Sequence, residues 1–127
     1  MVRIVIRKIR RAVFFAASNG AEPLRSWLQG LSEDDRKSIG TDIARVEYGA
    51  AMKMPLVGHL GNGLWEVRTR LRRGRIARVF FCVVGSEMVL LHGIVKKSMK
   101  TPTNELKTAR RRKREWETDD APKEEPP

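Results

Sequence analysis

Three strand-like segments, residues 64–71, 76–84 and 88–95, constrain the fold of this chain most strongly. The first alternates apolar and charged side chains, which is typical of a strand with one buried face. The second is β-branched and aromatic. The third is a nearly continuous apolar run, which favours an interior position in a sheet. The connections between them are only four and three residues long, so we expect an antiparallel meander.

A short strand and two helices are expected before this meander. Residues 11–17 are rich in Val and Phe, which favours a strand. Pro23 suits the first position of a helix, and Gly30 suits its end. Ser32 is followed by three acidic residues, which makes it a suitable N-cap for a second helix that reaches Gly49.

Three further segments are assigned from their composition. Residues 49–63 contain several glycines and no clear period, which predicts a loop. Thr101 is the expected N-cap of a last helix, which runs to about Trp116. Residues 117–127 are acidic and proline-containing, so we expect them to form a disordered tail.

Together the segments predict a single α+β domain over residues 1–116, in which residues 1–10 are either a strand or a loose lead segment. The expected order is an N-terminal strand, two helices, a three-stranded antiparallel meander and a C-terminal helix. We expect the helices to pack on one face of the sheet. The other face, which carries Glu66, Arg68 and Arg78, is then expected to be uncovered.

Positive charge is concentrated in the second half of the chain. The formal net charge is +11, and residues 64–114 hold fifteen Lys and Arg against three Glu. Solvated surfaces usually interleave both signs, so a block this basic favours a polyanionic partner over a merely solvated face. Nucleic acid is favoured over anionic lipid, because no basic segment has a strong apolar face opposite it.

Several function classes are excluded by what the sequence lacks. The single cysteine, Cys82, allows neither an internal disulfide nor a cysteine-based zinc site, and the two histidines are few for a metal centre. There is no phosphate-loop or dinucleotide motif, and no stretch approaches the ~18 apolar residues of a membrane span. The apolar run at residues 12–17 is too short for a signal peptide. We therefore expect a cytoplasmic protein with no cofactor, no metal and no membrane association.

Arg78 is the most informative polar residue, because it lies inside an apolar strand segment. A buried cation costs solvation free energy unless it meets an anion or an opening. One interpretation is a structural ion pair with Glu66 on the neighbouring strand. The other is a phosphate clamp, in which Arg78 and Arg68 flank one concave patch, since a guanidinium matches phosphate geometry.

Other candidates follow from their positions. Lys96 and Lys97 come directly after the third strand segment, where they are either solvated or bind a phosphate near the start of the last helix. His92 lies in an apolar run and is either a hydrogen-bonded core residue or a general acid or base. The weaker catalytic candidates are His92 and Glu66. Nine residues are candidates for contacts with an RNA backbone: Arg70, Arg73, Arg75, Lys100, Lys107, Arg110, Arg111, Lys113 and Arg114.

These candidates suggest a class of reaction. A phosphodiester cleaved without a metal points to RNA, whose 2′-hydroxyl can attack the adjacent phosphate while nearby cations stabilise the charge that develops.

An ordered series of short motifs resembles the phage-derived, HigB-like branch of the RelE toxin superfamily, over about residues 11–114. The motifs in chain order are GLWEVR at 63–68, RIARVFF at 75–81, LLHGIVKK at 90–97 and KTP at 100–102. By the family's pattern, Arg68 and Arg78 match basic residues of its catalytic face, and Lys96 and Lys97 match the pair after its last strand. The chain departs from the pattern at Phe81, which is often Tyr in relatives.

The resemblance implies a compact sheet with helices on one side and the function of a type II toxin. Such a toxin is an endonuclease that cleaves mRNA on the ribosome, in contact with 16S rRNA, and it is neutralised by a helix-turn-helix antitoxin. Some relatives carry a proton-transfer Tyr or His near the C-terminus, which this chain lacks. A nonenzymatic nucleic-acid-binding module that keeps the fold and the partner is therefore the alternative. A basic structural protein of a ribosome or virion is a third interpretation.

Overall fold

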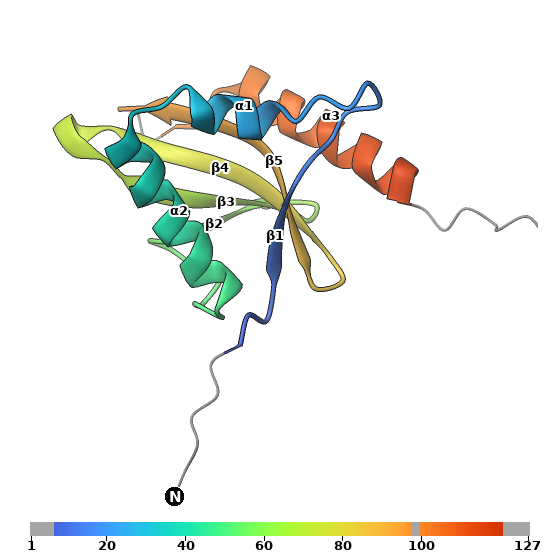
Figure 1. Cartoon of the computed structure of the whole chain (residues 1–127), viewed down its shortest axis with the longest axis horizontal. Helices are drawn as coiled ribbons and strands as arrows, with labels where there is room; N and C mark the ends of the chain where they lie inside the picture. Colours follow the sequence, from blue (N-terminus) through green and yellow to red (C-terminus); the bar gives the residue numbers. More distant parts are fainter. Residues whose placement is uncertain (1–6, 98–99, 121–127) are drawn as a thin grey trace, which may run out of the picture.

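A five-stranded mixed sheet lies at the centre of the computed structural model, which describes residues 7–97 and 100–120 (Figure 1). The strand order is β1-β5-β4-β3-β2. Strands β2 to β5 are antiparallel neighbours, whereas β1 pairs with β5 in parallel. The α+β class is confirmed, but the sheet is larger than the expected three-stranded meander. The strands are β1 Arg11–Phe14, β2 Val57–Gly61, β3 Leu64–Arg70, β4 Ile76–Val84 and β5 Glu87–Lys96.

Three α-helices accompany the sheet in the described part of the chain: α1 Pro23–Gln29, α2 Glu33–Glu47 and α3 Thr103–Asp120. Their first two boundaries confirm the sequence signals. Pro23 begins α1, and Gly30 caps its end. Ser32 is the N-cap of α2, because its hydroxyl accepts a hydrogen bond of 3.2 Å from the backbone N–H of Asp35. A short 3₁₀ turn, Arg72–Gly74, joins β3 to β4.

The helices cover both faces of the sheet, so the expectation that they share one face is wrong. Helices α1 and α2 pack on the face that carries Val79 and Phe81 of β4. Helix α3 packs on the opposite face, where Ala109 contacts the cluster of Phe80 and Cys82. The physical reason lies in β4, which is apolar on both faces and is buried only when both are covered.

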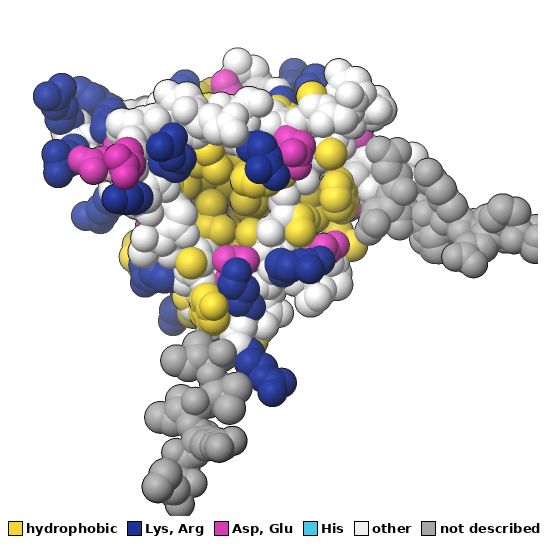
Figure 2. Space-filling model, viewed as in Figure 1, with side chains coloured by type: hydrophobic (Ala, Val, Ile, Leu, Met, Phe, Trp, Pro, Cys, Tyr) yellow, Lys and Arg dark blue, Asp and Glu magenta, His cyan; other side chains and the backbone are white. Residues whose placement is uncertain are grey.

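The face that was expected to be open is therefore partly occupied. Glu66, Arg68 and Arg78 lie on the α3 side of the sheet, and Arg78 is 0% exposed. Figure 2 shows the other side of the sheet, the one that carries α1 and α2. Apolar side chains are visible there in a hollow between α1 and α2, and Lys and Arg side chains surround it.

The segment predicted to be a loop, residues 49–63, contains strand β2. Sequence periodicity misses this strand because two of its five residues are glycines. Gly58 lies opposite Glu66 on β3. A Cβ atom at Gly58 would come within 3.1 Å of Oε1 of Glu66, so the missing side chain makes room for that carboxylate.

The C-terminal helix begins and ends later than expected. It starts at Thr103, so Thr101 lies before the helix and is not its N-cap. It continues to Asp120, so the described part of the expected tail is helical. Lys113 and Glu117 form an ion pair of 2.5 Å one turn apart, which supports this extension. Residues 121–127 lie outside the described part of the chain.

The N-terminal prediction is tested only from residue 7, since residues 1–6 lie outside the described part. The backbone N–H groups of Ile9 and Arg10 donate to the carbonyl oxygen of Glu47, which attaches this segment to the end of α2. None of the helices in the described residues combines the length and apolar character that crossing a bilayer requires.

Candidate phosphate-binding site

Arg68 of β3 and Arg78 of β4 face each other across the two strands. This direct pairing places the two arginines on one face of the hairpin. Both side chains project to the α3 side, because residues of equal parity share a face of a strand. Like charges directly opposite each other are destabilising, so this pair requires nearby negative charge or polar partners.

Glu66 and Thr101 supply those partners. Glu66 lies two positions before Arg68 on β3 and is 5% exposed, and its Oε1 is 3.5 Å from Nε of Arg68. The hydroxyl of Thr101 accepts a hydrogen bond of 3.1 Å from Nη1 of Arg78 and donates one of 3.3 Å to Oε2 of Glu66. Thr101 therefore links the buried arginine to the buried carboxylate. Sequence analysis missed this role, because Thr-Pro before a helix is also a capping signal.

The two arginines differ in accessibility. Burial lowers the pKa of the Arg78 guanidinium below its ordinary value; Glu66 opposes this shift and Arg68 adds to it. With no exposed surface, Arg78 does not reach a ligand directly in this arrangement, which corrects the expected direct phosphate clamp. The side chain of Arg68 retains 12% exposure. Arg68 is therefore the accessible arginine of the pair.

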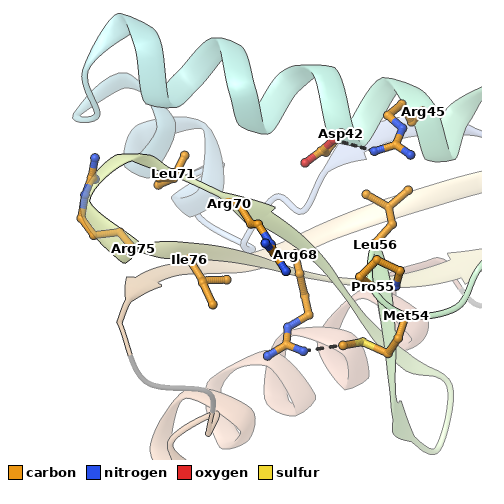
Figure 3. Close-up of a pocket in the computed structure, with 11 residues that line it drawn as sticks. Asp42, Arg45, Met54, Pro55, Leu56, Arg68, Arg70, Leu71, Arg75 and Ile76 are labelled. Carbon is orange, nitrogen blue, oxygen red and sulfur yellow. Dashed lines mark hydrogen bonds and ion pairs between the residues drawn. The ribbon is translucent and has the colours of Figure 1, made fainter.

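Arg68 borders a pocket at the outer edge of β3 (Figure 3). Its Nη1 lies 3.6 Å from the sulfur of Met54, in the segment before β2. The pocket has a volume of about 580 Å³. We call it the edge pocket. Its lining residues are Asp42, Arg45, Met54, Pro55, Leu56, Arg68, Arg70, Leu71, Gly74, Arg75 and Ile76.

The two lysines after the third strand segment lie at the end of β5 and are exposed. Lys96 is the last residue of β5 and pairs with Ile76, which places it on the same face as Arg78. Lys97 follows it. Both amines are therefore accessible to a ligand from solution, either on the α3 side of the sheet or at the end of β5.

His92 is placed differently from the other candidates. Its Nε2 contacts the carboxylate of Glu105 on α3, and its Nδ1 accepts a hydrogen bond of 2.9 Å from Nη1 of Arg112. Arginine only donates, so Nδ1 is the acceptor in this contact. Arg112 also donates to the carbonyl oxygen of Leu91 at 2.9 Å. Both ring nitrogens thus fasten α3 to β5, which fits the structural interpretation of this histidine.

Three residues expected to contact RNA make structural contacts instead. Arg75 forms two hydrogen bonds with Asp35 of α2, at 2.6 and 3.1 Å, and this contact lowers the pKa of the Asp35 carboxyl. Arg110 donates to the carbonyl oxygens of Leu60 and Gly61. The third, Lys113, pairs with an acid one turn along α3. Six others are exposed: Arg70, Arg73, Lys100, Lys107, Arg111 and Arg114.

The described residues contain no group of three or more His, Cys, Asp or Glu side chains that could hold a metal ion. The site is thus a cationic cluster around one buried carboxylate. It consists of Glu66, Arg68, Arg78 and Thr101, which we call the Arg–Glu cluster, beside the edge pocket.

Comparison with known proteins identifies a family. The family model described as phage-derived protein Gp49-like (DUF891) matches residues 26–114, which span α2, four of the five strands and most of α3. None of the curated proteins matches the chain. The matched region includes the whole Arg–Glu cluster and covers well over half of the sequence. The chain therefore belongs to the phage-derived Gp49-like family.

Proposed function

We propose that this protein is a toxin of a type II toxin–antitoxin system that cleaves mRNA on the ribosome without a metal ion. The observation that carries the proposal is the Arg–Glu cluster, in which an accessible arginine lies beside a buried carboxylate. A guanidinium binds a phosphate through paired N–H groups, and a carboxylate can accept a proton beside it. The motif resemblance to HigB-like toxins supports the same conclusion.

The reaction uses these two groups together with Lys97. Glu66 accepts the proton of an RNA 2′-hydroxyl, and the 2′-oxygen forms a bond to the adjacent phosphorus. The bond between phosphorus and the 5′-oxygen then breaks, which leaves a 2′,3′-cyclic phosphate. Lys97 donates the proton that the leaving oxygen requires. Arg68 stabilises the negative charge on the pentacoordinate phosphorus, a role for which one donor typically contributes about 10²–10³ in rate.

Arg78 acts as a positioning residue in this scheme. Its guanidinium is buried, and Thr101 connects it to Oε2 of Glu66. It therefore orients the carboxylate through the Thr101 hydroxyl. His92 has no catalytic role in the scheme, because its ring contacts Glu105 and Arg112 of α3 and not the Arg–Glu cluster.

The remaining cations bind the substrate. Lys96 lies on the same face as the cluster, and the exposed arginines and lysines of α3 supply charge for RNA backbone contacts. Ribosomal RNA is the polyanion that such a basic surface would meet on a translating ribosome.

For the antitoxin partner, we propose the hollow between α1 and α2, which exposes apolar side chains on the face away from α3 (Figure 2). Phe14 and Trp27 pack on the core of this face and are only partly buried. A helix-turn-helix protein bound there would neutralise the toxin.

The proposal is tested with purified protein and a short radiolabelled RNA, alone and on translating ribosomes. The expected result is cleavage that leaves a cyclic phosphate or 3′-phosphate, lost in Glu66→Gln and retained with free RNA in EDTA. Because ribosomes need Mg²⁺ themselves, the EDTA arm uses free RNA at high protein concentration. Cleavage of free RNA that stops in EDTA and resumes with Mg²⁺ would refute metal independence.

A second function, RNA binding without cleavage, is favoured by one observation, the complete burial of Arg78. In that case the wild-type protein binds RNA and does not cleave it, either alone or on ribosomes. Growth arrest upon induction, relieved by Glu66→Gln, would favour the endonuclease over this alternative.

A further inference from the structure

The edge pocket has a chemistry that the proposed function does not use. Its apolar lining, which we call the floor, comes from Met54, Pro55 and Leu56 before β2, together with Leu71 and Ile76. In Figure 3 the side chains of Arg68 and Arg70 lie between Ile76 and the segment that holds Met54, Pro55 and Leu56. Pockets of roughly 300–1,000 Å³ with an apolar lining and a few polar groups are typical binding sites for small ligands or parts of larger ones.

The arginines around the pocket differ in whether an acidic side chain neutralises them. Arg45 is paired with Asp42 at 3.2 Å, and Arg75 is held by Asp35. Arg70 is exposed and forms no ion pair with any described residue. Arg70 therefore leaves positive charge in the lining of the pocket, next to Arg68.

The backbone of β3 adds directional groups. The N–H of Arg68 donates to the carbonyl oxygen of Leu56 at 2.8 Å, toward the β2 side of β3. Hydrogen-bonding directions alternate along a strand, so the N–H and C=O of Arg70 point to the same side. Strand β2 begins only at Val57, so this edge of β3 opens into the pocket. The pocket thus offers a donor and an acceptor beside an apolar surface.

An apolar floor, an adjacent pair of backbone groups and an unneutralised arginine match one nucleotide of single-stranded RNA. The base packs on the floor, its edge meets the backbone groups, and its phosphate meets Arg70. We infer that the edge pocket binds the base of the nucleotide next to the phosphate held by Arg68, and thereby contributes to the choice of cleavage position. This inference rests on the proposed function, which places the reacting phosphate at Arg68.

The test measures binding with RNA that cannot be cleaved. A fluorescent 2′-O-methyl RNA octamer lacks the attacking hydroxyl, and eight variants of it each replace one nucleotide with an abasic unit. Binding to the wild-type protein is expected to weaken about 5- to 150-fold for the abasic unit at one position and little elsewhere, as for loss of one stacked base. The Met54→Ala variant changes a residue that is 50% exposed. It is expected to bind the intact octamer as weakly as the wild type binds the octamer with the critical abasic unit. Its affinity should then no longer depend on which position is abasic.

Arg73 provides a matched control for the charge. It is exposed in the turn between β3 and β4 and does not line the pocket. Arg70→Ala is expected to weaken binding more than Arg73→Ala, while both keep the wild-type melting temperature. Equal losses would mean that Arg70 contributes only general attraction, and would overturn its assigned phosphate contact.

Cleavage assays separate this inference from the proposed function. If the wild-type protein cleaves RNA but Met54→Ala and the abasic series have no effect, the pocket does not bind a base. If no cleavage occurs but Met54→Ala still removes the effect of the abasic unit on binding affinity, the pocket assignment stands and the endonuclease proposal fails.

Discussion

The hydroxyl of Thr101 lies 3.1 Å from Nη1 of the buried Arg78 and joins that guanidinium to Glu66. The segment between β5 and α3 thus completes a cluster whose other members come from adjacent strands. This arrangement is what allows two arginines, Arg68 and Arg78, to face each other across β3 and β4. It also makes the cluster sensitive to single-atom changes in residue 101.

Thr101→Val is expected to destabilise the fold by about 1–3 kcal/mol, because it removes the hydroxyl and leaves buried charged groups without one partner. Cleavage should fall as well, since Glu66 loses the group that orients it. Urea unfolding measures the first effect and an RNA cleavage assay the second. Thr108→Val is the matched control, because that hydroxyl bonds only to a helix carbonyl on an exposed face. Equal stability of the two variants would contradict the role of Thr101.

Arg68→Ala is expected to lower cleavage about 10²–10³-fold while the protein remains folded, because its guanidinium is the accessible cation of the cluster. Arg68→Lys should recover only part of the rate, since an ammonium group cannot make paired contacts with a phosphate. Single-turnover kinetics and a melting curve measure the two properties. Cleavage by Arg68→Ala at the wild-type rate would exclude Arg68 from the reaction.

His92→Ala is expected to lower the melting temperature and to leave the pH dependence of cleavage unchanged. The ring joins Glu105 and Arg112 of α3 to β5, and its loss removes partners from both. His59→Ala is the matched control, because His59 is exposed on β2. A change in the pH profile of cleavage would instead identify His92 as a proton donor or acceptor.

Asp35 and Arg75 predict a dependence of stability on pH. The hydrogen bonds from Arg75 lower the pKa of the Asp35 carboxyl below its ordinary value of 3.8. A carboxyl with a lowered folded-state pKa contributes stability that is present above the unfolded-state value and is lost as the pH falls through the folded-state value.

Asp35→Asn should therefore be less stable than the wild type at neutral pH, and the difference should shrink below about pH 4. Melting temperatures between pH 7 and pH 2.5 measure it. Asp34→Asn is the control, because Asp34 is exposed and lies 3.6 Å from Arg72. A difference that stays constant across this range would show that the ionised carboxylate is not what stabilises the contact.

The sequence by itself determined the local elements whose signals lie within a few residues. Pro23 and Ser32 mark the starts of α1 and α2, because ring geometry and capping act on adjacent backbone groups. The sequence also indicated that β3 and β4 form a hairpin, since only a short connection separates the two segments. The partner of Arg68 on β4 was not predictable in this way, because the expected turn at 72–75 would pair Leu71 with Ile76, whereas Arg70 pairs with Ile76 in the structure.

Tertiary structure alone decided which of the candidate residues lie together in one site. Strand β2 forms because β3 offers it a partner, and Gly58 leaves space for Glu66. Thr101 reaches the cluster across more than twenty residues from Arg78, and His92 meets α3 rather than the cluster. Contacts of this kind depend on how helices cover the two faces of the sheet. That choice is set by the summed burial of side chains from the whole chain, which no local pattern contains.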